Sequence, residues 1–185
     1  MKRLIPALAA AALALPVAAV EYGTPDTAKS ALSFTTKQMG VPVDGKFNRF
    51  KVTLNFDPAA VQKASAGFEL ELASIDAGSK EANDEVVGKD WFNVKQFPTA
   101  VFKSTAVKAL GGNKFEVSGP LTIKGRTQTV TAPFTYKAEG SNGVFDGAFT
   151  IKRLQFGVGE GPWGDTSTVA DEVLIKFHLI AAARK

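Results

Sequence analysis

The chain of 185 residues offers few side chains that could carry out catalysis. It contains no cysteine and a single histidine, His178, so thiolate nucleophiles and metal sites built from several Cys or His ligands are excluded. A Ser-His-Asp arrangement would depend on His178 alone, and this residue falls at a polar position of an alternating segment. We therefore expect a surface histidine, no catalytic residue, no metal site and no enzymatic activity.

Two other patterns that could support chemistry are better explained by structure. Asp84-Glu85 and Asp171-Glu172 are neighbouring carboxylates. Adjacent residues point to opposite faces of a strand, and they do not face each other on a helix. The run Gly157–Gly164 is rich in glycine but lacks the Gly-Lys-Ser/Thr ending of a phosphate-binding loop. We expect this run to be a long loop between the last two strands.

Phenylalanine is the residue type in surplus, with 14 Phe against two Tyr and two Trp. In the alternating segments described below, almost all Phe fall on one face and the lysines fall on the other. A protein that binds single-stranded nucleic acid would instead expose its aromatic rings. The pattern indicates an apolar interior and argues against nucleic acid as a partner.

The first 19 residues have the features of a secretory signal peptide. The positive start, Met1-Lys2-Arg3, precedes an apolar stretch rich in Ala and Leu, and small residues precede the expected cleavage after Ala19. This stretch is shorter than the roughly 20 residues that span a bilayer. We expect residues 1–19 to be removed, residues 20–185 to form one domain, and the mature protein to reside in the bacterial periplasm. Without Lys2 and Arg3 the net charge falls from +4 to +2, with 20 basic against 18 acidic residues.

The remaining chain is dominated by apolar residues at every second position, which predicts strands. About eight segments show this pattern, at residues 32–36, 50–56, 68–72, 101–105, 115–123, 130–136, 145–151 and 173–179. Turns rich in Gly, Pro, Asn and Asp separate them, including a hairpin turn at Gly125-Arg126. Residues 79–94 lack the alternation and predict a short helix that Ser79 caps. A closed antiparallel barrel and a two-sheet sandwich both fit.

The surplus of Phe admits two interpretations. A barrel of about eight strands is just wide enough to be filled by side chains or to hold one small ligand. The interior is therefore either a lumen that binds a lipid or an ordinary packed core in a secreted domain that acts by contact with proteins. The inward-facing candidates for a lumen are Phe34, Leu70, Phe102, Phe134, Phe149 and Phe177. Trp91 and Trp163 are candidates for its mouth, where their N–H groups would meet a polar head group.

Several segments, taken in order, resemble the YceI-like family. They are Gly45–Phe50, Ala73–Asp76, Asp90–Asn93, Phe97–Phe102, Gly119–Gly125 and the loop from Phe156 to Thr166. The resemblance implies an all-β fold: an eight-stranded antiparallel lipocalin-like barrel with a short helical insert near residues 79–94. It also implies a protein of Gram-negative bacteria that holds a polyisoprenoid, an isoprenoid quinone or a similar long-chain amphiphile in the barrel.

The resemblance carries two further expectations. The bound lipid or quinone would be the only cofactor, and the partners would include a transient contact with a membrane or a membrane-bound cytochrome, with dimerisation left open. Many members have a histidine where Gln38 stands, and another histidine in the insert where this chain has Asn83-Asp84-Glu85-Val86. Head-group contacts inferred from those histidines therefore do not transfer to this chain.

Overall fold

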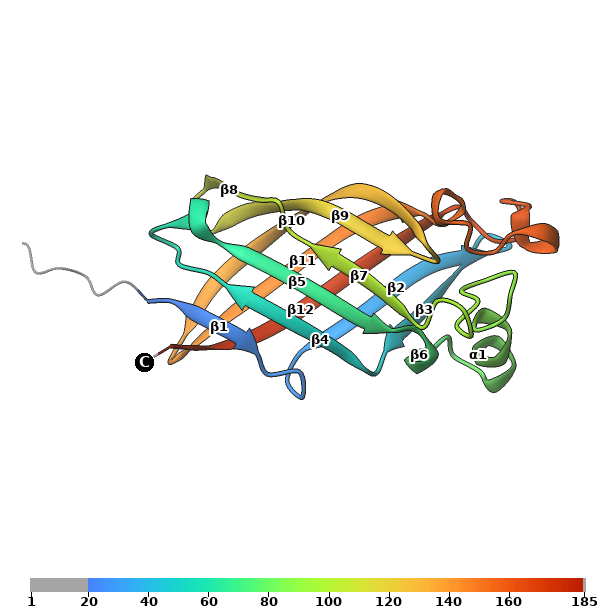
Figure 1. The fold of residues 1–185 in the computed structure, drawn as a ribbon, viewed down its shortest axis with the longest axis horizontal. Coiled ribbons are helices and arrows are strands. Elements are labelled where there is room, and N and C mark those ends of the chain that lie inside the picture. Colours follow the sequence, from blue (N-terminus) through green and yellow to red (C-terminus); the bar gives the residue numbers. More distant parts are fainter. Residues whose placement is uncertain (1–19, 185) are drawn as a thin grey trace, which may run out of the picture.

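The computed structural model describes residues 20–184, so the expected signal peptide, residues 1–19, lies outside the described residues. One strongly curled antiparallel sheet of twelve strands makes up most of this part of the chain (Figure 1). The strands are β1 (Tyr22–Pro25), β2 (Ala31–Gln38), β3 (Val41–Phe47), β4 (Phe50–Asn55), β5 (Ser65–Glu71), β6 (Ile75–Asp76), β7 (Thr99–Lys103), β8 (Ala106–Gly111), β9 (Lys114–Ile123), β10 (Arg126–Glu139), β11 (Asn142–Lys152) and β12 (Glu172–Ala183).

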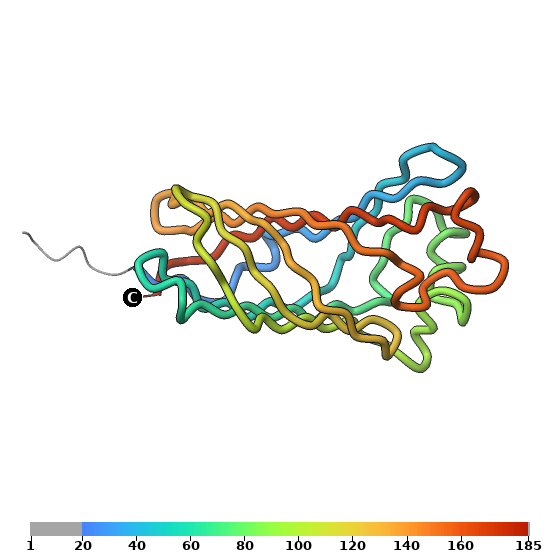
Figure 2. The backbone as a smooth tube through the Cα atoms, turned by 90° about the horizontal axis from the view of Figure 1, so that it is seen from above, coloured from blue at the N-terminus to red at the C-terminus, as the bar shows by residue number. Residues whose placement is uncertain are grey.

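The sheet curls until its two ends meet. The strands follow the order β4-β5-β7-β9-β10-β11-β12-β2-β3-β6, while β1 adds to β12 and β8 adds to β9. Only Asn48 and Arg49 separate β3, near one end of this order, from β4 at the other. Tyr22 and Phe56 exchange two backbone hydrogen bonds of 2.8 and 3.2 Å, which join β1 to the end of β4. The sheet thus surrounds a long interior (Figure 2).

The antiparallel all-β prediction is confirmed, and the two-sheet sandwich is wrong because all strands belong to one sheet. Every predicted strand is present, but the count of eight misses β1, β3, β6 and β8. Strands β1 and β6 are only four and two residues long. Most residues of β3 and β8 are exposed, and β3 also contains Pro42 and Gly45, which are rare in strands. The turn between β9 and β10 is centred on Lys124 and Gly125 rather than on Gly125-Arg126. These two residues have the positive φ angles, 49° and 74°, of a tight hairpin turn.

The predicted helix is present but shorter than residues 79–94. Helix α1 (Lys80–Val86) begins where the Ser79 hydroxyl accepts a hydrogen bond from the backbone N–H of Ala82 at 3.1 Å. It ends at Val87, and the chain continues through turns to Phe97. The helix lies across one end of the curled sheet (Figure 1). Within residues 20–184, no helix is long and apolar enough to cross a membrane.

Buried apolar side chains form a cluster at each end of the sheet. The β1-end cluster centres on Phe56, which is 1% exposed and packs edge-on against Phe115 and Phe145 with ring centroids 5.3 and 5.1 Å apart. The α1-end cluster includes Phe34, Leu72 and other buried residues near the helix. Phe50 and Phe177 pack against both clusters. The two clusters therefore lie at opposite ends of an interior that runs between them.

Candidate functional site

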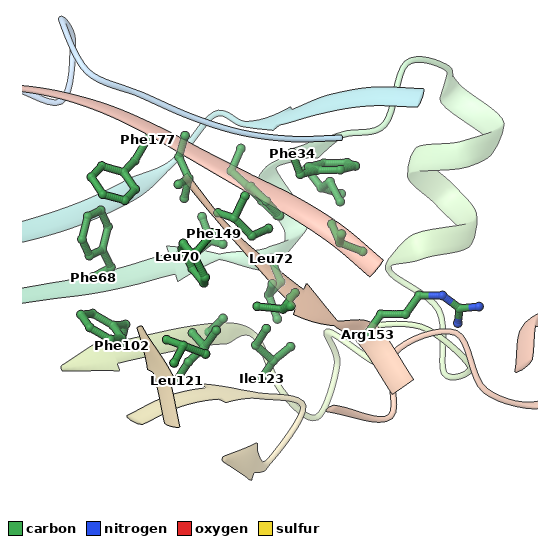
Figure 3. A pocket seen from close by; sticks show the side chains of 18 of the residues that line it. Phe34, Phe68, Leu70, Leu72, Phe102, Leu121, Ile123, Phe149, Arg153 and Phe177 are labelled. Carbon is green, nitrogen blue, oxygen red and sulfur yellow. The ribbon is translucent and has the colours of Figure 1, made fainter. Parts of the chain in front are cut away.

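An apolar cavity of about 650 Å³ occupies the interior of the curled sheet. Inward-facing side chains of β2, β4, β5, β7 and β9–β12 form its wall, and Figure 3 shows part of this lining. The volume falls within the range of roughly 300–1,000 Å³ that is typical of small-molecule sites. The hypothesis of a ligand-free domain requires a packed interior. The interior of this structure is instead hollow.

All six predicted lumen residues line this cavity. They are Phe34, Leu70, Phe102, Phe134, Phe149 and Phe177. Phe134 belongs to the β1-end cluster, where its ring stacks on that of Phe115 at 5.4 Å, so it forms part of the end wall. The alternation of the strands placed these side chains correctly, whereas their contact with a ligand stays a prediction.

Two glycines allow Phe rings to lie flat against the wall of the cavity. In the sheet register, Phe34 pairs with Gly45 and Phe177 pairs with Gly147. A Cβ atom at either glycine would collide with the ring opposite it. Each ring therefore covers its glycine instead of standing in the lumen, and the cavity keeps its width.

The end of the cavity beside α1 is covered by two segments. We call residues 79–98 the insert and residues 153–170 the late loop. The carbonyl of Asp90 in the insert accepts hydrogen bonds from the backbone N–H groups of Gly159 and Glu160, at 2.9 and 2.8 Å. The late loop connects β11 to β12, as predicted. The insert and the late loop thus form one cap.

Trp91 and Trp163, the candidates for the mouth, lie together in this cap. Their ring centroids are 5.5 Å apart, and both residues line the cavity. Trp163 Nε1 donates to Glu85 Oε1 of α1 at 2.8 Å. Trp91 Nε1 is buried and has no hydrogen-bond partner. The N–H group of Trp163 is thus engaged by Glu85, whereas that of Trp91 has no partner among the described residues. Their contact with a head group stays a prediction.

Arg153 organises the late loop and was missed by the sequence analysis. Its side chain is 2% exposed, and its guanidinium donates five hydrogen bonds of 2.7–3.0 Å to backbone carbonyls. The acceptors are Val158, Gly159, Trp163, Val169 and Ala170. Burial lowers the pKa of this guanidinium, and the nearby charge of Asp171 opposes the shift. In sequence, no pattern distinguishes Arg153 from its exposed neighbour Lys152.

A second polar contact ties the late loop to the β9–β10 hairpin. Lys124 Nζ donates to the carbonyl of Gly157 at 2.6 Å and approaches Glu160 Oε2 at 3.3 Å. Arg126 donates to Glu160 Oε1 at 2.7 Å. Partial burial opposes ionisation of Glu160, but the hydrogen bond from Lys124 and the charges of Lys124 and Arg126 outweigh it and lower the pKa of this carboxyl.

The tip of the β2–β3 hairpin completes the rim of the cavity. Gln38 bridges to Val169, and the backbone N–H of Met39 donates to the carbonyl of Thr168 at 2.8 Å. The exposed residues among the cavity lining are Gln38, Ser65, Ser79, Glu81 and Glu85. All except Ser65 lie on this hairpin or on the insert. The cavity therefore reaches the surface between α1, the late loop and the hairpin, and we call this opening the mouth.

His178 lies outside the cavity, on the outer face of β12. Its Nδ1 lies 2.6 Å from Asp146 Oδ1 of the neighbouring strand, and its side chain is 44% exposed. Among residues 20–184, no group of three or more His, Cys, Asp or Glu side chains is arranged to hold a metal ion.

A curled antiparallel sheet around an apolar cavity defines a class of proteins, the small all-β proteins that enclose a hollow interior. Within this class, the chain belongs to the YceI-like domain family, whose sequence model matches residues 24–181. The resemblance noted in the sequence is thereby confirmed.

Individual relatives agree with this assignment. A UPF0312 protein of Pseudomonas savastanoi pv. phaseolicola is 31% identical over 131 residues, which cover 67% of this chain and 68% of the relative. The crystal structure of Burkholderia cenocepacia BcnA is 51% identical and superposes with a TM-score of 0.83, covering 85% of this chain and 99% of BcnA. A polyisoprenoid binding domain of Saccharophagus degradans shares the fold, with a TM-score of 0.66 at 16% identity, over 89% of this chain and 99% of that domain.

Proposed function

We propose that this protein binds a polyisoprenoid, an isoprenoid quinone or a similar long-chain amphiphile in its cavity, without catalysing a reaction. Membership of the YceI-like family supports the proposal, as does the description of the Saccharophagus degradans domain as polyisoprenoid binding. The candidate contacts are the Phe and Leu side chains of the lining. Each CH₂ group of a ligand that leaves water for such a lining contributes roughly 0.8 kcal/mol.

The size of the cavity is the observation that carries the proposal. A volume of about 650 Å³ lies within the roughly 300–1,000 Å³ of small-molecule sites and far exceeds the small voids of a packed core. The lining side chains are mainly Phe, Leu, Ile, Val and Ala, so water that enters through the mouth finds few hydrogen-bond partners. The cavity therefore favours an apolar occupant over water.

The proposal includes the shape and location expected from the sequence. We take the curled sheet to work as a lipocalin-like barrel. The pairs β1 and β2, β3 and β4, β5 and β6, and β7 and β8 each share one position, so the twelve strands fill eight positions around the cavity. We also propose that the mature protein acts in the periplasm. Contact with a membrane-bound cytochrome stays a prediction of the family resemblance, which makes no prediction of the oligomeric state.

Mass spectrometry of the bound lipid tests the proposal directly. Protein purified from its native host is extracted with organic solvent, and the extract is compared with that of the same protein after delipidation. We expect an isoprenoid lipid or quinone in about equimolar amount. A native preparation that releases no apolar molecule would refute the proposed function.

A substitution at Gly147 tests whether the lumen itself binds the ligand. In Gly147→Ala the new methyl group pushes the Phe177 ring off the wall and into the cavity. We expect affinity for a fluorescent farnesol analogue to fall about tenfold, or ~1.4 kcal/mol, with an overpacking cost of about 1–3 kcal/mol in stability. The control is Gly164→Ala, since nothing lies within 4 Å of a Cβ atom at Gly164. Equal affinities in the two variants would place the ligand elsewhere.

A further inference from the structure

The tip of the β2–β3 hairpin exposes apolar side chains to solvent. Residues 38–43, Gln-Met-Gly-Val-Pro-Val, carry no charge. Met39 is 70% exposed and Val41 is 63% exposed, the highest values among the large hydrophobic residues of the described chain that are exposed. We call residues 38–43 the hairpin tip. It is an apolar element that the fold holds away from the core.

The requirements of the turn do not account for this composition. Met39 and Gly40 have positive φ angles of 48° and 80°, a conformation that favours Asn, Asp or Gly. The β8–β9 turn, Gly111-Gly112-Asn113, and the β10–β11 turn, Gly140-Ser141, follow that preference. The β9–β10 turn departs from it with Lys124, whose φ is 49° and whose side chain donates to the carbonyl of Gly157 in the late loop. A methionine at position 39 therefore works against the turn, and its side chain serves another purpose.

The hairpin tip lies beside the mouth of the cavity. Gln38 and Val43 belong to the lining, and backbone hydrogen bonds join Lys37 and Met39 to the late loop. Figure 2 shows the β2–β3 hairpin projecting beyond the body of the molecule, at the end opposite the C-terminus. A flat surface laid against the side of this end from which the hairpin projects would contact the hairpin tip, beside the mouth.

We propose that the hairpin tip inserts into the surface of a lipid bilayer and holds the mouth against it. Two exposed apolar side chains fall far short of the roughly 800 Å² per partner that a stable protein interface buries. An apolar loop of this kind is suited to the boundary between head groups and acyl chains, where a few apolar side chains give reversible binding. Because the tip carries no charge, the contact depends on apolar insertion and fits a bilayer of zwitterionic lipids.

The inference that the hairpin tip docks on a bilayer is drawn from the exposed side chains of Met39 and Val41. Only the role of this docking in ligand transfer rests on the proposed function. A water-insoluble ligand that moves between the bilayer and the cavity through an adjoining mouth avoids passage through water. The exposed side chains of Met39 and Val41, which do not line the cavity, would thereby set the rate at which it fills.

A fluorescence experiment tests the docking without any ligand. The chain has no cysteine, so Met39→Cys provides one attachment site for the environment-sensitive dye NBD. Leu110→Cys is the matched control, because Leu110 is 56% exposed on β8 near the opposite end of the molecule (Figure 1). With phosphatidylcholine vesicles we expect the emission at position 39 to shift to the blue and rise at least twofold, with no change at position 110.

Other outcomes of this experiment overturn the proposal. Equal responses at the two positions, or none at position 39, would rule out docking by the hairpin tip. A blue shift at position 39 that grows with protein concentration in the absence of vesicles would assign the tip to contact between copies of the chain.

Ligand transfer separates this inference from the proposed function. The double variant Met39→Asp/Val41→Asp should take up a fluorescent farnesol analogue from phosphatidylcholine vesicles at least tenfold more slowly than the unaltered protein. Its affinity for the same analogue added from solution should be unchanged. Unchanged uptake from vesicles would refute the docking. If the unaltered protein fails to bind the analogue from either source while position 39 still responds to vesicles, the proposed function fails and the docking stands.

Discussion

Arg153 solves a local problem of the late loop. Loop segments that turn back on themselves leave carbonyl groups without partners, and a buried carbonyl without a hydrogen bond is costly. The five donors of the guanidinium satisfy carbonyls from Val158 to Ala170, and its plane lies over the ring of Trp91 with 5.6 Å between the guanidinium carbon and the ring centroid. One side chain thus fixes the path of the late loop and the position of a mouth residue.

Replacing Arg153 by methionine should release the late loop. The substitution keeps an apolar stem but leaves up to five carbonyls without donors, and hydrogen bonds to charged groups contribute about 1.5–3 kcal/mol each. We expect a loss of at least ~3 kcal/mol and a fall in Tm of about 10 °C. Thermal unfolding followed by circular dichroism measures it. Lys152→Met, on the exposed neighbour, should leave Tm within a degree or two; a similar fall in both variants would contradict the role of Arg153.

At this scale the sequence predicts wall residues better than mouth residues. The period of two places Phe34 and Phe177 on the inner face because strand geometry fixes where every second side chain points. The contacts of Trp163 and Arg153 depend on the path of a long loop, which no periodicity describes. The N–H group of Trp163 was therefore assigned to a ligand, although Glu85 of α1 accepts its hydrogen bond.

Among the elements, the cap combines apolar packing with polar contacts at its edges. Phe156 and Val158 of the late loop are buried in the α1-end cluster, and Phe92 of the insert packs against it. Glu160 links the late loop to the β9–β10 hairpin through Lys124 and Arg126. Glu85 links the late loop to α1. The cap is thus packed on the sheet and also attached to it at a few charged points.

The contact of Glu160 predicts a weaker cap in acid. Because the pKa of Glu160 is lowered in the folded state, its stabilisation is fully present above the unfolded pKa, about 4.3, and is lost as the pH falls through the folded value. We expect Glu160→Gln to have a lower Tm than the unaltered protein at pH 7, and this difference to shrink as the pH falls below about 4.3. Thermal unfolding across pH 3–7 measures it.

Glu139→Gln serves as the control for this pH dependence. Glu139 is similarly exposed and pairs with Lys137 two residues away on the same strand, so it joins no separate elements. Its Tm difference from the unaltered protein should be small at every pH. A difference for Glu160→Gln that stays constant from pH 7 to pH 3 would contradict a stabilising role for the charge of Glu160.

The sequence predicts the strands that bury one face, because their apolar residues recur at every second position. Ser79 indicates the start of α1 because a cap depends on local residue type. The helix ends at Val87 because the chain turns back within the insert, where the carbonyl of Val86 accepts from the backbone N–H of Phe92. Strand β3 is hard to predict because Pro42 and Gly45 are unusual in strands and most of its residues are exposed. A glycine is required at position 45 because the ring of Phe34 on β2 covers it and leaves no space for a Cβ atom. This contact joins two strands and cannot be predicted from the local sequence.

In the whole molecule, Phe56 closes the interior at the end far from the mouth. It lines the cavity and packs against the rings of Phe115, Tyr136 and Phe145. Phe56→Ala should cost about 3–5 kcal/mol and lengthen the cavity towards β1. Denaturant unfolding measures the loss of stability. The control is Val101→Ala, at a side chain that is 43% exposed, for which we expect a change within about 0.5 kcal/mol. Equal losses would contradict the closure of this end by Phe56.

The pairing of β12 has a consequence for how the chain folds. This strand, near the end of the chain, lies between β11 on one side and β1 and β2, from its beginning, on the other. Leu174 thus pairs with Thr35, and the ring of strands cannot close until almost every residue is available. Contacts between such distant parts of a chain make folding slow. The complete chain therefore spends time with its apolar wall uncovered, and assistance by a chaperone during this interval would limit aggregation.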